Sequence, residues 1–244
     1  MTGLISALEE ELVLFKEHAE IEQVVRQSGI DFHFGRLAGQ KVILLRCGVG
    51  KVNAAVATQL LIDRFGVNAV IFTGLAGALV PHLRKGDVVI SNFVVQHDID
   101  LTAFGHRRGE IPELTRMIEA DPKLVHAAAD AFEEVAKAGY SNHHLLVGTI
   151  ATGDSFISSK DKIRWLQREF GAVAAEMEGG AVGQVCQINR VPFVVIRVIS
   201  DGGGDGAAGE FIQFLGEASE LTFRITRALM TNMTATRDLT GVTT

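Results

Sequence analysis

The stretch VPFVVIRVISD, residues 191–201, is the most apolar in the chain. Between Pro192 and Asp201 every residue except Arg197 is apolar or small, so the run lacks the alternation expected of a strand with one wet face. It predicts a strand from Pro192 to Ser200 that is buried on both faces, at the centre of a sheet. The first polar pair, Ser200 and Asp201, opens directly onto the glycine-rich DGGGDGAAG.

Further apolar runs alternate with helical patterns on either side of this stretch. The other predicted strands are Thr2–Ala7, Phe32–Leu37, Lys41–Cys47, Ala69–Thr73, Asp87–Ser91, Leu145–Ile150 and Val173–Ala175. The predicted helices are Glu9–His18, Asn53–Phe65, Leu124–Ala138, Lys160–Glu169, Glu178–Asn189 and Glu210–Met230. This order predicts the α/β class: a single domain over residues 1–232, with a mostly parallel mixed central sheet flanked by helices. The polar residues 233–244 are expected to form a disordered tail.

The composition restricts the class of protein. Hydrophobic residues make up 47% of the 244, enough for a sizeable core. A net charge of −6 without a basic patch argues against a nucleic-acid partner. No apolar run reaches the ~20 residues of a membrane span, and acids follow the N-terminal apolar run, unlike a secretory signal. With Cys47 and Cys186 both in apolar segments, we expect a cytoplasmic protein with reduced core thiols.

Several familiar motifs fail on spacing. CGVGKV is not a phosphate loop, since Leu45 replaces its first glycine and Val52 its Ser or Thr, and Asn53 breaks a dinucleotide fingerprint. The segment from Asp201 begins like a calcium loop but has Ile212 at the twelfth position, where a Glu is required. Zinc-ligand spacing and a G-x-S-x-G elbow are also missing from the sequence. Of the eight histidines, only His97 stands beside acids.

Carboxylates follow three of the predicted strands. They are Glu9–Glu11 after the first, Glu176 and Glu178 after Val173–Ala175, and Asp201 after the most apolar strand. Acids in the first turn of a helix complement its dipole, and this alternative accounts equally well for the first two groups. Functional residues of α/β folds also collect at the carboxyl ends of strands, which favours a site.

Two further features need a structural explanation. Arg197 lies in the middle of a buried strand and must find an acidic partner, which the sequence does not identify. Gly179 and Gly180 stand at a helix start, where each costs about 1 kcal/mol relative to Ala. We hypothesise that other groups pack closely against their backbone at the floor of a pocket.

Eight motifs occur in an order that resembles a known superfamily. They are ISALEEEL, CGVGKVNAA, TGLAGAL, HDIDLTAFG, ATGDSFI, AAEMEGGAV, VPFVVIRVISD and EFIQFL, and they extend from Ile5 to about Met230. Together they resemble the nucleoside phosphorylase and nucleoside hydrolase superfamily, and most closely the bacterial 5'-methylthioadenosine/S-adenosylhomocysteine nucleosidases. The resemblance implies a three-layer sandwich of the nucleoside phosphorylase type and a role in methionine salvage.

The resemblance also implies roles for individual residues. Glu11 would activate the attacking water, Asp201 would protonate the adenine leaving group at N7 with help from Ser200, and Glu178 would bind the ribose hydroxyls. The other residues implied to contact substrate are Glu176 and Met177 at the ribose, Phe156 and Ile157 at the purine, Phe211 between base and sugar, Ala76 and Gly77 near ribose and base, and Val49 near the 5' group. Leu101, Phe104 and Pro112 would reach the 5' pocket of a neighbouring subunit, which implies a homodimer.

The implied reaction is hydrolysis of the N-glycosidic bond of 5'-thio-substituted adenine nucleosides, without a metal or organic cofactor. Such cleavage passes through an oxocarbenium-like sugar and needs an acid on the base and an activated water. The superfamily's phosphorylases bind phosphate with Arg residues. Here the segment FTGLAG has Phe72 before Thr73 and contains no Arg. The nearest basic residues, Lys51, Arg84 and Lys85, match no phosphate-binding position. Water is therefore the expected nucleophile.

Several positions depart from the family pattern. Leu8 stands where many family members have Met, and Leu75 stands where a Ser is common. In EGGAV the residues after the second Glu differ from the usual Ala-Thr, and residues 202–209 are unusually rich in glycine. These changes leave the exact substrate open, and the glycines predict a mobile lid. The alternatives are another nucleoside substrate such as 5'-deoxyadenosine or futalosine, a true phosphorylase, and a catalytically silent nucleoside-binding module.

Overall fold

The computed structural model describes residues 1–202 and 206–239, and the segment predicted to form a mobile lid, residues 202–209, therefore lies partly outside the described residues. The strands are β1 Thr2–Ser6, β2 Glu20–Gln27, β3 Ile30–Leu37, β4 Gln40–Arg46, β5 Ala69–Ala78, β6 Val88–Gln96, β7 Ile118–Glu119, β8 Leu145–Thr152, β9 Ala172–Glu176 and β10 Phe193–Asp201. The helices are α1 Glu9–His18, α2 Lys51–Phe65, α3 Pro122–Val135, α4 Lys160–Phe170, α5 Gly179–Asn189 and α6 Ala207–Leu239, with a 3-10 turn η1 Thr102–Phe104 and a π turn η2 Ala136–Tyr140.

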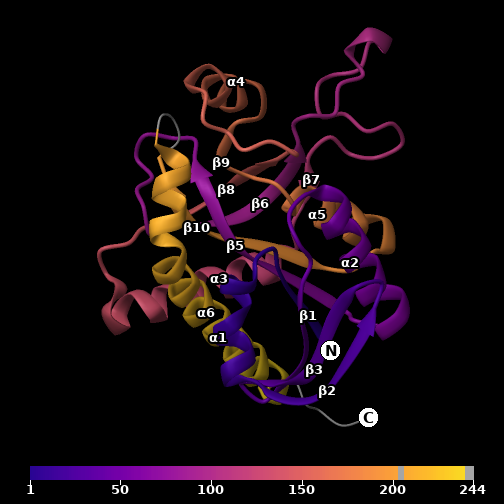
Figure 1. Ribbon diagram of the computed structural model, residues 1–244, viewed down its shortest axis with the longest axis vertical. Coiled ribbons are helices and arrows are strands. Elements are labelled where there is room, and N and C mark those ends of the chain that lie inside the picture. Colours follow the sequence, from indigo (N-terminus) through magenta and orange to yellow (C-terminus); the bar gives the residue numbers. More distant parts are fainter. Residues whose placement is uncertain (203–205, 240–244) are drawn as a thin grey trace.

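All ten strands join one mixed sheet (Figure 1). Strands β4, β1, β5 and β10 pair in parallel, and so do β6, β8 and β9. The two groups are joined by antiparallel pairs, β10 with β6 and β5 with β9. Since β5 pairs with β10 as well as with β9, the strands β5, β10, β6, β8 and β9 close into a ring. The prediction of flanking layers did not include this closure.

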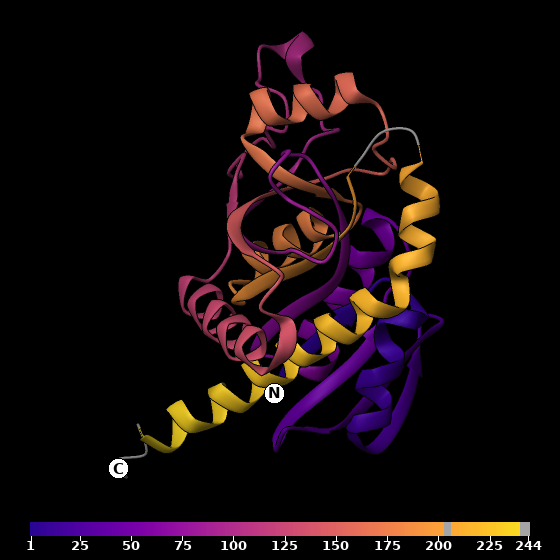
Figure 2. The ribbon, with the colours of Figure 1, turned by 90° about the vertical axis from the view of Figure 1, so that its left-hand side faces the viewer.

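Helices cover both faces of the sheet, as predicted (Figure 2). In β10, Val195 and Ile199 pack in the core beneath α2 and α5, whereas Val194 and Ile196 pack in the core beneath α1, α3 and α6. Each alternate side chain is therefore buried in one of two apolar cores, which explains why this strand shows no polar alternation. Every residue of β10 is buried.

The crossing of β5 and β9 positions the site. The prediction ended this strand at Thr73, but β5 continues through the sequence TGLAGA as far as Ala78. Its Gly77 pairs with Ala175 of β9 and also with Asp201 of β10. The carboxyl ends of three strands thus meet at one place, although β9 runs antiparallel to β5.

Two segments differ from the predicted ones at the edges of the molecule. The exposed edge strand β2 was not predicted, because its charged sequence EIEQVVRQ has no continuous apolar face. The prediction of a disordered tail from residue 233 is wrong as far as Leu239, because α6 continues to that residue, and residues 240–244 lie outside the described ones. In Figure 2 the end of α6 extends away from the body of the protein. Within the described part of the chain, no helix is long and apolar enough to cross a membrane.

Candidate active site

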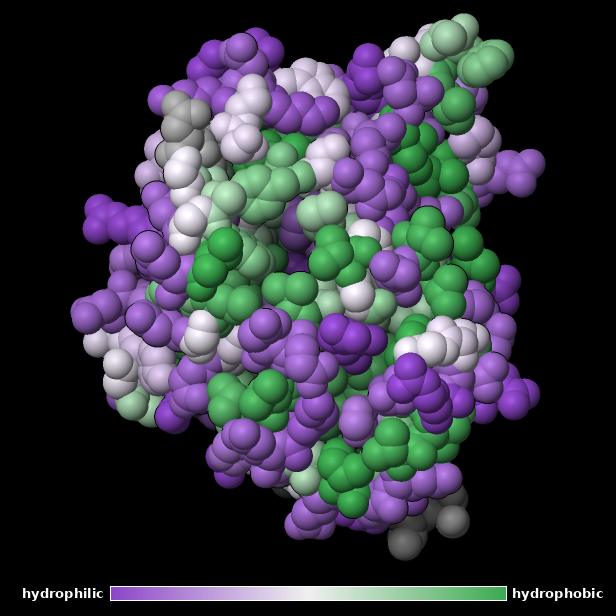
Figure 3. Space-filling view, viewed as in Figure 1, coloured by the Kyte–Doolittle hydropathy of each residue, from purple (hydrophilic) through white to green (hydrophobic). Residues whose placement is uncertain are grey.

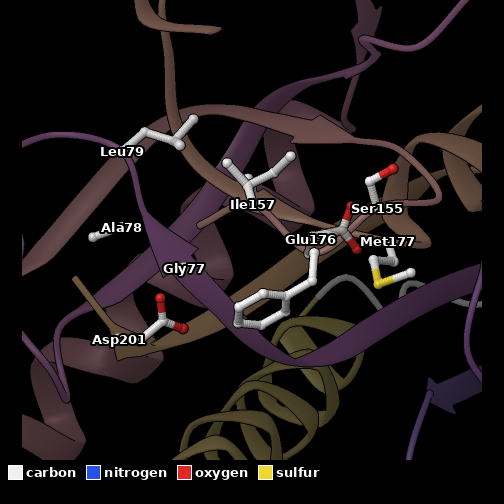
Figure 4. Close-up of a pocket in the computed structure, with 10 residues that line it drawn as sticks. Gly77, Ala78, Leu79, Ser155, Ile157, Glu176, Met177 and Asp201 are labelled. Atoms are coloured by element: carbon white, nitrogen blue, oxygen red, sulfur yellow. The ribbon is translucent and has the colours of Figure 1, made fainter. Parts of the chain in front are cut away.

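A cavity of about 390 Å³ opens at the carboxyl ends of β1, β5, β9 and β10. Figure 3 shows a hollow near the middle of this face, with apolar surface around its rim. A narrower recess continues from the cavity, and its lining includes Ser155, Ile157 and Leu79 (Figure 4). The lining of the main chamber is Ala7, Leu8, Glu11, Val49, Leu75, Ala76, Gly77, Phe156, Ala175, Glu176, Met177, Glu178, Ser200, Asp201, Ala208, Phe211 and Ile212.

The cavity brings together residues that are far apart in the sequence. Of the predicted site residues, eleven line the main chamber and Ile157 lines the recess. Leu101, Phe104 and Pro112 lie outside it, on the segment around η1 that projects at the upper right of Figure 1. Phe104 is 81% exposed and lines neither the chamber nor the recess.

The sequence reasoning missed part of the chamber wall. Ala208 and Ile212, which were not predicted, line the cavity from the first turns of α6 together with the predicted Phe211. Their spacing of three and four places them on one face of a helix, which is a recognisable signal. The predicted helix began only at Glu210, and the wall residue Ala208 was therefore not recognised.

Glu11 is held in place by the backbone. Its Oε2 accepts hydrogen bonds from the N–H groups of Ala7 and Leu8, at 3.0 and 2.9 Å, and its Oε1 accepts from Leu75 N at 3.1 Å. Burial raises the pKa of Glu11, although the Arg197 charge and these three N–H groups favour the ionised form. A carboxylate with a raised pKa is a stronger base than an exposed one and is suited to accept a proton.

Arg197 finds its partner in Glu176. The guanidinium, 1% exposed, donates from Nη2 to Glu176 Oε2 at 2.6 Å and stacks 4.0 Å from the centre of the Phe72 ring. Gly74 leaves the space for this arrangement, because a Cβ there would lie 2.6 Å from Glu11 Oε1 and 2.9 Å from Arg197 Nη1. The positive charge therefore lies among the buried carboxylates and offsets part of their repulsion.

Glu176 is fully engaged by protein groups. Its Oε1 accepts from the Thr152 hydroxyl, and its Oε2 accepts from the N–H groups of Glu178 and Gly179 as well as from Arg197. The two N–H groups belong to the start of α5, where the first turn lacks partners within the helix. Glu176 lines the cavity, but its oxygens serve to fix Arg197 and the turn into α5.

Glu178 is the acid of this segment whose carboxylate remains directed to the chamber. Its Oε1 accepts from Gly50 N at 2.8 Å, across 128 residues of sequence. Burial and the neighbouring Glu176 charge raise the pKa of Glu178 to about 7. The site therefore contains a carboxyl group whose protonation changes near neutral pH.

Asp201 faces the recess from the end of β10 (Figure 4). The Ser200 hydroxyl donates to its Oδ2 at 2.8 Å, and Gly77 is close enough that a Cβ would lie 3.1 Å from Oδ1. Figure 4 shows Asp201 at the lower left and Glu176 to the right, with Ile157 above the space between them and Met177 beside Glu176. The recess thus combines apolar walls with an acid at one end.

The close packing expected at Gly179 and Gly180 is confirmed, but neither glycine lines the cavity or its recess. A Cβ on Gly180 would lie 2.9 Å from both Thr152 Cβ and Gln96 Cγ, and one on Gly179 would lie 3.2 Å from Glu176 Oε2. The absence of side chains lets the start of α5 pack closely against Thr152, Gln96 and Glu176. This explains two residues that an isolated helix would disfavour.

The remaining candidates lie outside the chamber. His97 is buried, and within the described residues neither ring nitrogen has a hydrogen-bond partner. Cys47 and Cys186 are free and buried, and burial raises the pKa of both thiols. Across residues 1–202 and 206–239, no cluster of His, Cys, Asp and Glu is arranged to hold a metal ion.

Comparison with known proteins agrees with this geometry. The profile of the phosphorylase superfamily matches residues 2–231. The chain therefore belongs to the phosphorylase superfamily.

Individual relatives narrow the family. A 5'-methylthioadenosine/S-adenosylhomocysteine nucleosidase of Geobacillus thermodenitrificans is 40% identical over 230 residues, which are 94% of this chain and 95% of the relative. The Neisseria meningitidis nucleosidase of the same name, solved with methylthio-immucillin-A, has a TM-score of 0.89 at 34% identity and covers 95% of this chain and 98% of its own. A futalosine hydrolase of Helicobacter pylori has a TM-score of 0.87 at 34% identity, with 93% and 96% covered. Within the superfamily, this chain is thus a member of the 5'-methylthioadenosine/S-adenosylhomocysteine nucleosidase family.

Proposed function

We propose that this enzyme hydrolyses the N-glycosidic bond of 5'-thio-substituted adenine nucleosides and releases adenine. The observation that carries the proposal is the meeting of Glu11, Glu178 and Asp201, buried at three separate strand ends, in one cavity. The substrates are 5'-methylthioadenosine and S-adenosylhomocysteine, after which the relatives are named.

In the proposed reaction, Asp201 transfers a proton to N7 of adenine while the bond from the base to the sugar breaks. Glu11 accepts a proton from a water molecule, whose oxygen bonds to the anomeric carbon of the resulting oxocarbenium-like sugar. Glu178 holds the ribose hydroxyls and supplies negative charge beside that sugar. The products are adenine and the 5-thio-substituted ribose.

The surrounding residues position the two halves of the substrate. Phe156 and Ile157 enclose the purine in the recess, and Ser200 orients Asp201 through its 2.8 Å hydrogen bond. Met177 and Phe211 pack on the sugar, with Ala76 and Gly77 beneath it. Val49 and Leu8 border the 5' group, which extends along the apolar side of the chamber.

Water is the nucleophile in this proposal. Neither lysine nor arginine is among the described residues that line the cavity, and Arg197 beside it is paired with Glu176. A phosphate dianion would thus meet carboxylates without a compensating cation, at a high electrostatic cost.

The test is adenine release from a panel of 5'-substituted adenosines, with and without phosphate. We expect release without phosphate from the 5'-thio nucleosides, and D201N should lower kcat by a factor on the order of 10²–10⁴ with a smaller effect on binding. The control is D31N, in an exposed ion pair on β3. An absolute phosphate requirement, or a D201N rate equal to wild type, would contradict the proposal.

A second candidate substrate is futalosine, because a structural neighbour is a futalosine hydrolase. The wall residues that line the 5' side, Leu8, Val49 and Ile212, are apolar, and this favours a thioalkyl group over a larger polar one. Including futalosine and 5'-deoxyadenosine in the panel separates these cases by their ratios of kcat/KM.

We further infer a cytoplasmic homodimer. The first turns of α2 expose Val52 and Val56, at 73% and 44%, and Phe104 is 81% exposed on the projecting segment. Exposed apolar groups of this kind mark a protein interface. Leu101, Phe104 and Pro112 would complete the 5' pocket of the partner, and the two free buried thiols suit a reducing compartment.

A subunit-mixing experiment tests the shared pocket. F104A and D201N should each be impaired as homodimers. After exchange, mixed dimers contain one site with neither change, so about a quarter of the wild-type activity should return in an equal mixture. A mixture no more active than its components, or a monomer by light scattering, would contradict the dimeric site.

A further inference from the structure

Three segments that carry site residues are tied together outside the cavity. The first of these segments is the start of α2, which contributes its first residue, Lys51. The other two are the loops that follow β6 and β8, which contribute Asp98 and Asp154. Asp98 Oδ1 accepts from Lys51 Nζ at 2.6 Å, and Asp98 Oδ2 accepts from Asp154 N at 3.1 Å. Asp154 Oδ1 in turn accepts from Lys51 N at 2.8 Å. Each segment is therefore bonded to the other two.

Two members of this triangle lie close in sequence to groups of the cavity. Lys51 follows Gly50, whose N–H holds the Glu178 carboxylate at 2.8 Å. Asp154 precedes Phe156, which lines both the chamber and the recess. A displacement of either loop by 1 Å would therefore move a group that contacts the proposed substrate.

Gly50 shows how closely the loops are packed. Its φ of 97° is in the range that favours glycine, and a Cβ there would lie 3.1 Å from Asp154 Oδ1. The Asp154 carboxylate also lies at the N-terminus of α2, where the helix dipole favours a negative charge. Both backbone groups, at Gly50 and Lys51, and the side chain of Asp154 therefore form the contact between these two segments.

The environment of Asp98 makes it a firm link. The side chains of Asp98 and Lys51 are 31% and 18% exposed. Partial burial raises the pKa of Asp98, but the hydrogen bonds from Lys51 and from Asp154 N outweigh it and hold the pKa below its usual value. The carboxylate is therefore charged at neutral pH, and its loss would leave the Lys51 ammonium without its partner.

We propose that Asp98 is a positioning residue that couples the ribose side of the cavity to its purine side. It acts through Lys51 on Gly50 and Glu178, and through Asp154 on Phe156. Since the same segment continues to Leu101 and Phe104, it also links both sides to the proposed subunit contact. The inference rests on the proposed nucleoside hydrolysis for its effect on catalysis.

The test compares D98N with D100N. Asp100 is on the same segment, but it bonds Thr102 and Arg108 and none of the site loops. We expect D98N to raise KM and the inhibition constant of adenine by about tenfold, equivalent to about 1.4 kcal/mol, and to lower kcat. D100N should leave all three within about twofold of wild type. In K51M/D98N the loss in kcat/KM should be smaller than the product of the single losses.

Amide hydrogen exchange on the free protein provides a readout independent of activity. In D98N the amides of residues 49–51 and 154–157 should exchange faster, and in D100N they should not. If wild type hydrolyses no nucleoside, the proposed function fails while this comparison still decides the coupling. Unchanged exchange in these two segments, or a lowered melting temperature with KM and the adenine constant unchanged, would overturn the inference.

Discussion

The two acidic segments, Glu9–Glu11 and Glu176–Glu178, look alike in sequence but differ in the structure. In the first, Glu9 and Glu10 point outward at the start of α1 and only Glu11 is buried. In the second, both acids are buried, and the Glu176 carboxylate is bonded to Arg197 and to the turn into α5. The helix dipole is a sufficient explanation for Glu9 and Glu10. Burial separates Glu11 from Glu9 and Glu10, and the pairing with Arg197 separates Glu176 from Glu178.

The largest expected effect separates Glu11 from its neighbour. E11Q should lower kcat by a factor on the order of 10²–10⁴, because the amide cannot accept the proton of the attacking water. E10Q should retain the wild-type rate. Steady-state adenine release measures both, and equal rates for the two variants would break the distinction between the inner and outer acids.

The second segment should show its effect mainly in stability. E176Q leaves the Arg197 charge buried without a counter-ion, and we expect a loss of about 3–5 kcal/mol in the free energy of unfolding. Urea denaturation measures it. In the control, E169Q, the lost partner is Arg116 in a more exposed pair, and the loss should stay below about 1 kcal/mol. Similar midpoints for E176Q and E169Q would show that burial of the pair does not matter.

Glu178 should give the protein a pH-dependent stability. Its folded-state pKa of about 7 is raised above the unfolded value, so the folded state binds the proton more tightly. This contribution is fully present below about pH 4.3 and is lost as the pH rises through 7, with a total of up to about 4 kcal/mol. Relative to wild type, E178Q should therefore become more stable as the pH rises through this window. If the free energies of unfolding of wild type and E178Q changed in parallel with pH, the assignment of the raised pKa to Glu178 would be wrong.

A smaller effect concerns the glycines after Glu178. G180A should destabilise by about 1–2 kcal/mol, because the new methyl group meets Thr152 and Gln96. G216A, in open space on α6, should instead gain up to about 1 kcal/mol from helix propensity. Thermal unfolding measures both changes. A stabilised G180A would mean that the close packing at the start of α5 is not needed.

The smallest effect belongs to the exposed acids. E10Q should cost only about 0.3–1 kcal/mol, since it loses an interaction with the α1 dipole and nothing in the cavity. E9Q should cost somewhat more, because it also loses the exposed ion pairs of Glu9 with Lys16 and Arg46. Added salt should reduce both costs, as measured by urea denaturation at two salt concentrations. A cost that does not respond to salt would argue against a dipole effect.

The sequence predicted the elements whose side chains are buried on both faces. The strand over residues 192–200 is one example, because continuous apolar character is a strong signal. Edge strand β2 was missed since little of it is buried, and the length of β5 was missed since its glycines suggested a turn. The strand propensities of single residues do not indicate that Gly74 leaves space for the side chains of Glu11 and Arg197.

The site was predictable in its acids but not in their pairing. The location of acids after buried strands identified Glu11, Glu178 and Asp201 as candidates, and the resemblance supplied their roles. The bond between Arg197 and Glu176 depends on the crossing of β5, β9 and β10, which no local pattern contains. The same holds for the bond between Gly50 and Glu178.

The closed ring of strands has a consequence for the order of folding. β5 pairs with β10, and about half of the chain lies between these two strands. During synthesis, β1, β3 and β4 can pair while the chain is still short, but the ring has to wait until its last strand has left the ribosome. Until then the apolar edge of β5 lacks that partner. Such long-range pairing makes folding slow, and the nascent chain exposes an edge prone to aggregation until the ring closes.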